Sequence, residues 1–445
     1  MVHTSAMHIF SNFRFQLVLA TVALLAGAAF AQAPLESVPD DPFFADFKPV
    51  KAPVETSLIF KTGDKLAICG DSITEQKLYS RIIETYLTVC VPELKITTRQ
   101  YGWGGETAEG FYRRMTNDCL RFKPDVATLC YGMNDHHYES YKEETAKWFE
   151  NNTKGIVESF KEHGVRVILG SSSCIGKMPP WANAKKYTVK DMNLSLCAFR
   201  NIDIDLAGKE GVRFADVFWP MFKGGFEARQ KYGANYNIAG KDGVHPGWNG
   251  HAFMARAFLK AAGLDGNIGT FTVDLKEGTA TATEGHHIDK FQDNVVFVTS
   301  HKYPFCALGS PEDDNSIRST MALIPFNEEL NRLQLVVKNG TAANYKITWG
   351  KESHTYTAAQ LEKGINLAND FADNPFVPAF EAVDKAVADK EDYETRQIKS
   401  LFHGPEGQVD MDATVALSEK TREPRVKALA AAFIPVTHQI QIQPQ

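Results

Sequence analysis

Short apolar runs alternate with stretches of helical periodicity in the first half of the chain. The pattern predicts a buried strand at residues 65–69, a strand-like segment at 94–100, and further strands at 125–131, 165–170 and 212–218. Apolar side chains that recur every three or four positions predict helices near residues 78–89, 108–122, 144–163, 189–209 and 246–263. Strands that alternate with helices are typical of βαβ units. We therefore expect a three-layer α/β/α domain at residues 58–265, with a five-stranded parallel sheet of flavodoxin-like type.

The pattern changes after residue 265. Short β-like runs at residues 270–275, 295–299, 333–338 and 345–349 are separated by polar turns. Helical periodicity returns from residue 358, through residues 381–390 and on to 425–433. We predict a β-rich module at residues 266–357 and a helical C-terminal extension at residues 358–445. The segment 32–57, rich in proline and acidic residues, is predicted to be a linker.

The N-terminus has the pattern of an export signal. Arg14 precedes an apolar run at residues 15–30, which ends in the cleavage pattern Ala29-Phe30-Ala31. The run is shorter than the roughly 20 residues that a membrane-spanning helix needs. We expect a cleaved signal peptide at residues 1–31, with an uncleaved anchor as the alternative. The mature protein would be secreted or periplasmic and would not be inserted in a membrane.

Composition narrows the class of protein. The 445 residues include 44% hydrophobic and 23% charged residues, as in a globular protein. A formal net charge of −6 disfavours nucleic acid as a partner, because phosphate binding needs a basic face. Seven cysteines leave at least one without an intramolecular partner, and their spacing has no CxxC or zinc pattern. A disulfide such as Cys90–Cys119 stays open.

Four polar segments stand where predicted strands end or before the last helix of the α/β domain. They are GDSIT at 70–74, GWGGET at 102–107, GMND at 132–135 and DGVH at 242–245. Each has an ordinary structural interpretation by itself: a capping serine, a glycine turn, an Asn-Asp turn and a capping aspartate. Together they fall at one edge of the predicted sheet, where open α/β sheets hold their sites.

The residue types in these segments suit nucleophilic chemistry. A serine at a strand–helix turn exposes its hydroxyl, but it needs a base to remove the proton. An aspartate three residues before a histidine can reach Nδ1–H and leave Nε2 free as that base. An asparagine NH₂ or a glycine amide can donate to an oxyanion.

The four segments resemble the blocks of the SGNH (GDSL-like) hydrolases, which read GDS, G-x-x-G-x-T, G-x-N-D and D-x-x-H. The resemblance covers about residues 58–265 and leaves 266–445 unexplained. It implies a serine esterase without cofactor or metal. The implied roles are nucleophile, base and orienting acid for Ser72, His245 and Asp242. The implied oxyanion hole is formed by the amides of Ser72 and Gly105 and the side chain of Asn134.

The second segment leaves one role open and departs from the family pattern at one position. Gly104 stands next to Gly105, so the identity of the donating amide is open. Gln100 stands where the second block often begins with an asparagine that forms structural hydrogen bonds. Paired histidines at 136–137 and 286–287 do not predict a metal site, because adjacent side chains point apart on regular structure.

Aromatic residues near the four segments favour a sugar as part of the substrate, because aromatic rings with polar tips suit sugar faces. The candidate substrate-binding residues are Trp103, His136, Trp181 and Trp248. We predict an exported carbohydrate esterase that removes acetyl groups from a polysaccharide or oligosaccharide. A lysophospholipase, thioesterase or acyltransferase of the same family is one alternative, and a non-catalytic glycan-binding protein is another. The oligomeric state is open.

Overall fold

The computed structural model of the protein describes residues 33–445. The predicted signal peptide at residues 1–31 lies outside the described residues. Residues Leu35–Gln445 form one compact unit. Among the residues described, no helix is both long and apolar enough to cross a membrane. All seven cysteines are buried free thiols, so Cys90 and Cys119 are not joined.

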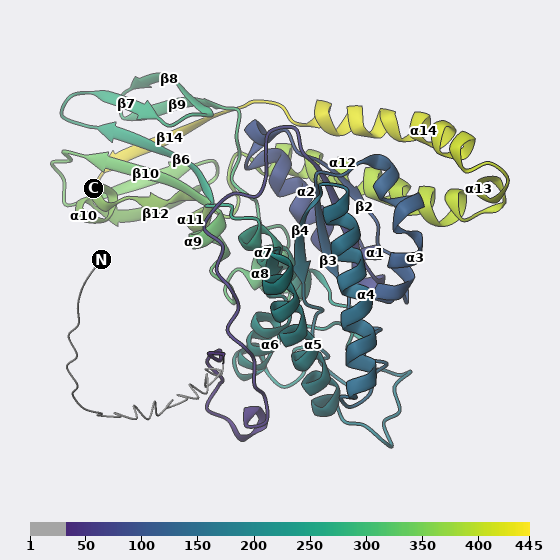
Figure 1. Ribbon diagram of the computed structural model, residues 1–445. Helices are drawn as coiled ribbons and strands as arrows, with labels where there is room; N and C mark the ends of the chain where they lie inside the picture. The colour runs from purple at the N-terminus through teal and green to yellow at the C-terminus, as the bar shows by residue number, and fades with distance from the viewer. Residues whose placement is uncertain (1–32) are drawn as a thin grey trace, which may run out of the picture. The chain divides into compact units, whose positions relative to one another are not determined.

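A five-stranded sheet with all strands parallel forms the centre of the first half of the chain (Figure 1). The strand order is β2-β1-β3-β4-β5. The bounds are β1 Lys65–Gly70, β2 Thr97–Gln100, β3 Val126–Cys130, β4 Arg166–Gly170 and β5 Arg213–Ala215. The predicted α/β fold class is therefore confirmed.

Helices bury both faces of this sheet. Leu66 and Ile68 of β1 belong to one core cluster, whereas Ala67 and Cys69 belong to another, as the two-residue period of a strand requires. The first cluster packs under α2 Tyr79–Val89 and α7 Trp248–Ala261. The second packs under α3 Ala108–Asp118, α4 Glu143–Glu162 and part of α5 Val189–Glu210. This double burial explains why strands such as β1 and β3 appear as continuous apolar runs in the sequence.

Two segments of this half depart from the sequence-based picture. The structure adds helix α6, Phe218–Tyr232, where the sequence analysis placed no element. The segment expected to be a linker packs on the sheet domain, since Phe44 and Phe47 are both 1% exposed and their rings lie against Trp219 and Phe222. The apolar rings, although surrounded by prolines and acids, are buried because each removes a large apolar area from water.

The β-rich part of the chain contains two sheets (Figure 1). One has the order β13-β10-β6-β7 and the other β12-β11-β14-β9-β8. The bounds are β6 Asn267–Asp274, β7 Thr279–Ala282, β8 His286–Gln292, β9 Val295–Ser300, β10 Arg332–Lys338, β11 Asn344–Trp349, β12 Glu352–Thr357, β13 Ile365–Asn366 and β14 Val436–Pro444. Strand β14, at the end of the predicted helical extension, lies between β9 and β11. The last residues of the chain thus complete the sheet β12-β11-β14-β9-β8.

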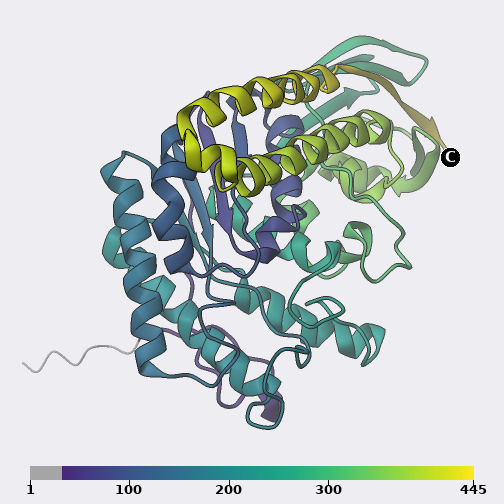
Figure 2. The same ribbon diagram turned by 90° about the vertical axis from the view of Figure 1, so that its right-hand side faces the viewer.

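Two long helices precede β14 and lie side by side (Figure 2). They are α12 Val377–Arg396 and α14 Met411–Ala432. A π-helical segment, Gln397–Phe402, extends α12 toward the α/β domain. The domain boundaries at residues 265 and 357 stay predictions.

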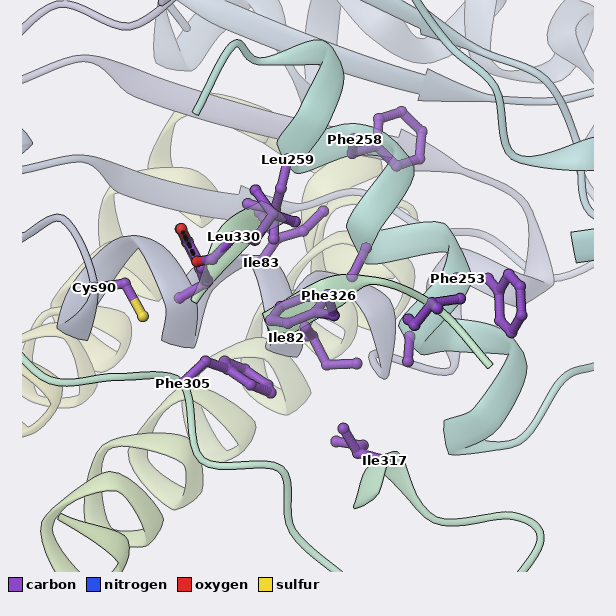
Figure 3. Packing of buried hydrophobic residues seen from close by; sticks show 14 of the residues in the cluster. Ile82, Ile83, Cys90, Phe253, Phe258, Leu259, Phe305, Ile317, Phe326 and Leu330 are labelled. Atoms are coloured by element: carbon purple, nitrogen blue, oxygen red, sulfur yellow. Dashed lines mark hydrogen bonds between the residues drawn. The ribbon is translucent and has the colours of Figure 1, made fainter. Parts of the chain in front are cut away.

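One hydrophobic cluster continues across residue 265 (Figure 3). Ile82 and Ile83 of α2 and Phe258 of α7 lie in the same cluster as Phe305 and Phe326, which follow the boundary. The rings of Phe305 and Phe326 lie 5.1 Å apart. Tyr86 of α2 donates its hydroxyl to the Leu330 carbonyl at 2.7 Å. The α/β domain and the C-terminal region therefore share a core.

Candidate active site

Ser72 stands directly after β1, at the first position of the four-residue helix α1, Ser72–Glu75. Asp71 caps this helix, accepting from the Ile73 amide at 2.9 Å. A side chain at Gly70 would come within 2.0 Å of Thr74 Oγ1, so the turn that presents Ser72 requires a glycine. The hydroxyl is thus held at the carboxyl end of the sheet.

Ser72, His245 and Asp242 form a continuous hydrogen-bonded row. Ser72 Oγ lies 2.7 Å from His245 Nε2, and His245 Nδ1 lies 2.7 Å from Asp242 Oδ2. Residues 173 positions apart in the chain are thus brought within hydrogen-bond distance. In this geometry the imidazole can accept the serine proton at Nε2 while the carboxylate holds Nδ1–H.

The Asp242 carboxylate is held by its own loop. Its Oδ1 accepts from the backbone amides of His245 at 2.9 Å and Val244 at 3.0 Å. Partial burial acts to raise the pKa of Asp242, but these amides and the His245 ring outweigh it, so the pKa lies below its ordinary value. Asp242 is therefore an anion at neutral pH, as a group that orients a histidine must be.

The glycines of the second segment differ in what their amides bind. The Gly104 amide donates to the carboxylate of Glu75, on α1. The Gly105 amide has no acceptor among residues 33–445, and its φ of +72° suits glycine. Gly105 is therefore the better placed of the two to donate to a ligand, which favours it where the sequence left both open.

Asn134 is oriented by two contacts. Its Nδ2 donates to the carbonyl of Glu106, the neighbour of Gly105, at 2.9 Å. Its Oδ1 accepts from the Tyr138 hydroxyl at 3.2 Å. The second NH₂ proton is left for a ligand, so Asn134 and Gly105, which are linked through Glu106, together offer two donors.

Asp135 joins the second and third segments, a role that the sequence analysis did not assign. Its Oδ1 accepts from the Ala108 amide at 2.8 Å and its Oδ2 from the Gly132 amide at 2.9 Å. Burial raises the pKa of Asp135 to about 7, although both amides oppose this shift. A buried residue with both oxygens bound to backbone amides fixes the loop that carries Asn134. The Asn-Asp pair itself was the signal that could have indicated it.

Gln100 replaces the family asparagine and still forms hydrogen bonds. Its Nε2 donates to the Thr74 carbonyl at 2.8 Å, and its Oε1 accepts from Thr395 at 3.2 Å. The first bond links the second segment to the turn that holds Ser72. The longer side chain also reaches α12, which no pattern within residues 58–265 could have indicated.

Residues 68–253 match the model of the GDSL-like Lipase/Acylhydrolase family. This part of the chain is a GDSL-like lipase/acylhydrolase domain. The expected enzyme class, a serine hydrolase of ester bonds, is confirmed at the level of this family. No curated protein is similar enough in sequence to match the chain.

Solved structures show how far the fold is shared. BT4096, a gut microbial diltiazem-metabolizing enzyme, is 21% identical with a TM-score of 0.70, over 88% of this chain and 100% of that chain. Axe2, an acetylxylan esterase from Geobacillus stearothermophilus, is 22% identical with a TM-score of 0.38, over 46% of this chain and 96% of that chain. At this identity, the first likeness establishes a common fold that extends beyond the hydrolase domain.

Of the predicted substrate-binding residues, Trp181 lies beside His245. Its ring centroid is 5.9 Å from that of His245 and 5.6 Å from that of Tyr138. Its side chain is 48% exposed, a large fraction for a tryptophan. Trp181 therefore offers an apolar surface next to the imidazole.

The other predicted substrate-binding residues have different surroundings. Trp103 packs edge-on against His403, with the ring centroids 4.9 Å apart, and Trp248 lies under Arg81 at 5.4 Å. His136 is 2% exposed, and burial lowers its pKa to about 4. Its Nε2 has no hydrogen-bond partner in the described part of the chain. Direct contact of these three with substrate stays a prediction.

A cavity of about 720 Å³ adjoins His245. Asp242 and His245 form part of its wall, and polar side chains from α6, the following loop and the loop before α8 (Ile317–Thr320) form much of the rest. Its volume falls in the range of small-ligand sites, about 300–1,000 Å³. No cluster of three or more His, Cys, Asp or Glu suited to a metal occurs within residues 33–445.

Proposed function

We propose that the protein hydrolyses acetyl esters on a saccharide, with Ser72 as nucleophile, His245 as general base and Asp242 as its orienting partner. The observation that carries the proposal is the Ser72–His245–Asp242 row, with both links at 2.7 Å, inside a GDSL-like hydrolase domain. A serine so placed can attack the ester carbonyl while His245 takes its proton. His245 then returns the proton to the leaving alcohol, and water repeats the sequence on the acyl-enzyme.

The proposed oxyanion hole consists of the amides of Ser72 and Gly105 and the side chain of Asn134. Neither of the two amides has an acceptor among residues 33–445. Asn134 is fixed by Glu106 and Tyr138, so its free proton needs no reorganisation during the reaction. These donors would stabilise the negative oxygen of the tetrahedral intermediate.

The surroundings of His245 favour a polar alcohol and a short acyl group. The cavity beside it has amide, hydroxyl and charged side chains in its wall, which can form hydrogen bonds with sugar hydroxyls. A more apolar cavity of about 570 Å³ lies between β2, α2 and α14, and its wall includes none of Ser72, Asp242 and His245. A long acyl chain would need apolar walls next to Ser72. We therefore favour a carbohydrate esterase over a lysophospholipase, a thioesterase or an acyltransferase.

We also propose that the protein is exported and acts on an acetylated glycan outside the cytoplasm. The apolar run at residues 15–30 with its cleavage pattern supports export. Determination of the N-terminal residue of the mature protein would test this, and a chain that still begins at Met1 would contradict it.

Acetate release from acetylated xylan and from acetylated monosaccharides tests the function. The full-length protein should release acetate, and Ser72→Ala should reduce the rate by at least about 10⁴-fold, the scale for loss of a serine nucleophile. A serine-reactive phosphonate should label the wild type at Ser72. Activity on long-chain esters alone would contradict the acetyl-glycan proposal and favour the lipid alternative. Absence of both labelling and turnover would favour the non-catalytic glycan-binding protein.

A further inference from the structure

The wall of the cavity beside His245 contains a cation, Arg229, that has no counter-ion among residues 33–445. Arg229 lies in the last turn of α6 and is partly buried in the cavity wall. Its guanidinium forms neither an ion pair nor a hydrogen bond with any side chain or carbonyl of residues 33–445. A guanidinium removed from water without an anion is unfavourable, so an arginine in such a place usually has a partner.

Two lysines reinforce the positive charge of this cavity. Lys177 and Lys241 are exposed in its wall and have no ion-pair partner in the described part of the chain. Of the two wall carboxylates, Asp242 is engaged by His245 and two backbone amides, and Asp314 is exposed and pairs with none of these cations. The cavity is thus positive inside a chain whose formal net charge is −6.

The position of the cavity indicates which part of the ester it would hold. His245 is in its wall, and in the proposed mechanism His245 Nε2 gives its proton to the leaving alcohol. The alcohol part of the ester must therefore lie next to His245, on the cavity side. The acyl part lies at the donors of Gly105 and Asn134. Arg229 consequently faces a group carried by the sugar and not by the acetyl group.

We propose that Arg229 binds a carboxylate on the sugar, so that the preferred substrate is an acetylated saccharide containing a uronic acid. This inference rests on the proposed function and names its substrate class. A guanidinium presents paired N–H donors that match the two oxygens of a carboxylate. One partly buried positive charge calls for one negative charge, which a uronate supplies. Lys177 and Lys241 would add attraction at longer range without fixing the geometry.

A matched pair of substrates tests the proposal. An O-acetylated methyl glucuronoside and the corresponding O-acetylated methyl glucoside differ only in having a carboxylate or a hydroxymethyl group at C6. The full-length protein should show a kcat/KM about 10- to 100-fold higher for the glucuronoside, the range expected for one charge-assisted bidentate pair. The preference should shrink as salt concentration rises, because it is electrostatic.

The variant Arg229→Gln separates a substrate contact from a structural role. It should abolish the preference for the glucuronoside and leave kcat/KM for the glucoside within about threefold. Lys231→Gln is the matched control, because Lys231 is exposed on the same helix and outside the cavity wall. The control should keep the full preference. If Arg229 only stabilises the end of α6, Arg229→Gln will lower the melting temperature and the activity on both substrates equally, and the proposal is wrong.

Hydrolysis of 4-nitrophenyl acetate by the same preparations distinguishes the two levels of failure. Turnover of this neutral ester without any preference for the glucuronoside overturns the uronate inference and leaves the esterase function intact. If no ester is turned over, the proposed function fails, and calorimetry with glucuronate and glucose then tests Arg229 separately. Binding of glucuronate that Arg229→Gln abolishes supports the carboxylate contact, and equal binding of both sugars overturns it.

Discussion

Lys399 Nζ lies 2.6 Å from Glu75 Oε1, so a residue of the π-helical segment after α12 contacts the short helix that begins at Ser72. The other oxygen of Glu75 accepts from the Gly104 amide. Lys399 also lies over the Trp103 ring, 5.3 Å from its centroid. A carboxylate at the candidate active site thus connects the C-terminal region to the loop that carries Gly105. π-Helical turns are frequent at functional sites.

The first prediction concerns this connection. Lys399→Met should lower kcat by between about 3- and 10-fold with little change in KM, because the Gly105 amide would be less well positioned for the transition state. Glu75→Gln should have a similar effect, and the double variant should be no worse than either, since the two residues act as one unit. Lys420→Met, exposed on α14, is the control. A change in KM alone would indicate a role in substrate binding instead.

The second prediction concerns Asn134. Asn134→Ala should lower kcat by about 10²–10³-fold while the protein keeps its fold, because one oxyanion donor is lost. Steady-state kinetics with 4-nitrophenyl acetate measure the effect, and circular dichroism checks the fold. Tyr138→Phe removes only the hydroxyl that orients Asn134, and it should lower kcat much less than Asn134→Ala does. A reduction below about fivefold for Asn134→Ala would show that the donors are elsewhere.

The third prediction concerns a buried charged group between α12 and the hydrolase domain. Lys390 is 1% exposed, and its ammonium lies 3.1 Å from Glu84 and 2.8 Å from Glu394. Lys390→Met would leave Glu84 without a counter-ion and Glu394 with Arg422 alone, and it should lower the free energy of unfolding by about 3–5 kcal/mol. Urea unfolding measures the change. Lys385→Met, on the exposed face of the same helix, should alter stability by less than about 0.5 kcal/mol.

A buried chain of hydrogen bonds joins the two C-terminal sheets. Trp349 Nε1 donates to His438 Nδ1 at 3.1 Å, so His438 carries its proton on Nε2. That nitrogen donates to Ser300 Oγ at 3.0 Å. Ser300 in turn donates to His286 Nδ1 at 2.8 Å, and His286 Nε2 donates to the Ile268 carbonyl at 3.0 Å. When both histidines are neutral, every hydrogen bond in this series has one donor and one acceptor.

The fourth prediction concerns proton binding by His438 in the folded and unfolded protein. Burial and the nearby His286 together lower the pKa of His438 to about 3, against the opposing charge of Asp289. Between about pH 6.5 and pH 3, the unfolded chain therefore binds a proton at His438 that the folded protein excludes. The free energy of unfolding should fall as the pH is lowered through this window, by up to about 1.4 kcal/mol per pH unit for this group.

Urea unfolding at several pH values between 7 and 4 measures this slope. His438→Gln should make it shallower, although the other buried histidines keep part of it, since burial also lowers the pKa of His136 to about 4. His287→Gln is the control, because this side chain is 74% exposed. A slope that His438→Gln leaves unchanged would contradict the assignment.

The sequence alone was sufficient for the strands of the α/β half, although it missed helix α6 and the packing of the segment expected to be a linker. Runs such as residues 65–69 are buried on both faces, so local hydrophobicity reveals each strand without knowledge of its neighbours. The four segments that contain Ser72, Gly105, Asn134 and Asp242 follow from the same logic, because the ends of parallel strands meet at one edge. Their catalytic roles remain predictions that the proposed variants test.

The C-terminal half depended more on long-range contacts. Strand β14 pairs with β9 on one side and β11 on the other, and this pairing stabilises it. Its local sequence pattern is too weak to predict a strand directly after a helical stretch.

The sequence by itself determined the strand–helix order and the chemical groups at the ends of the strands, since both depend on residues close together in the chain. Only the tertiary structure decided that Lys399 contacts Glu75, 324 positions away, and that Arg229 lies in the wall of the cavity beside His245 with no carboxylate of residues 33–445 paired to it. Hydrogen bonds and ion pairs act over a few ångströms in space, whatever the separation along the chain. Their partners are therefore set by how the two halves pack against each other.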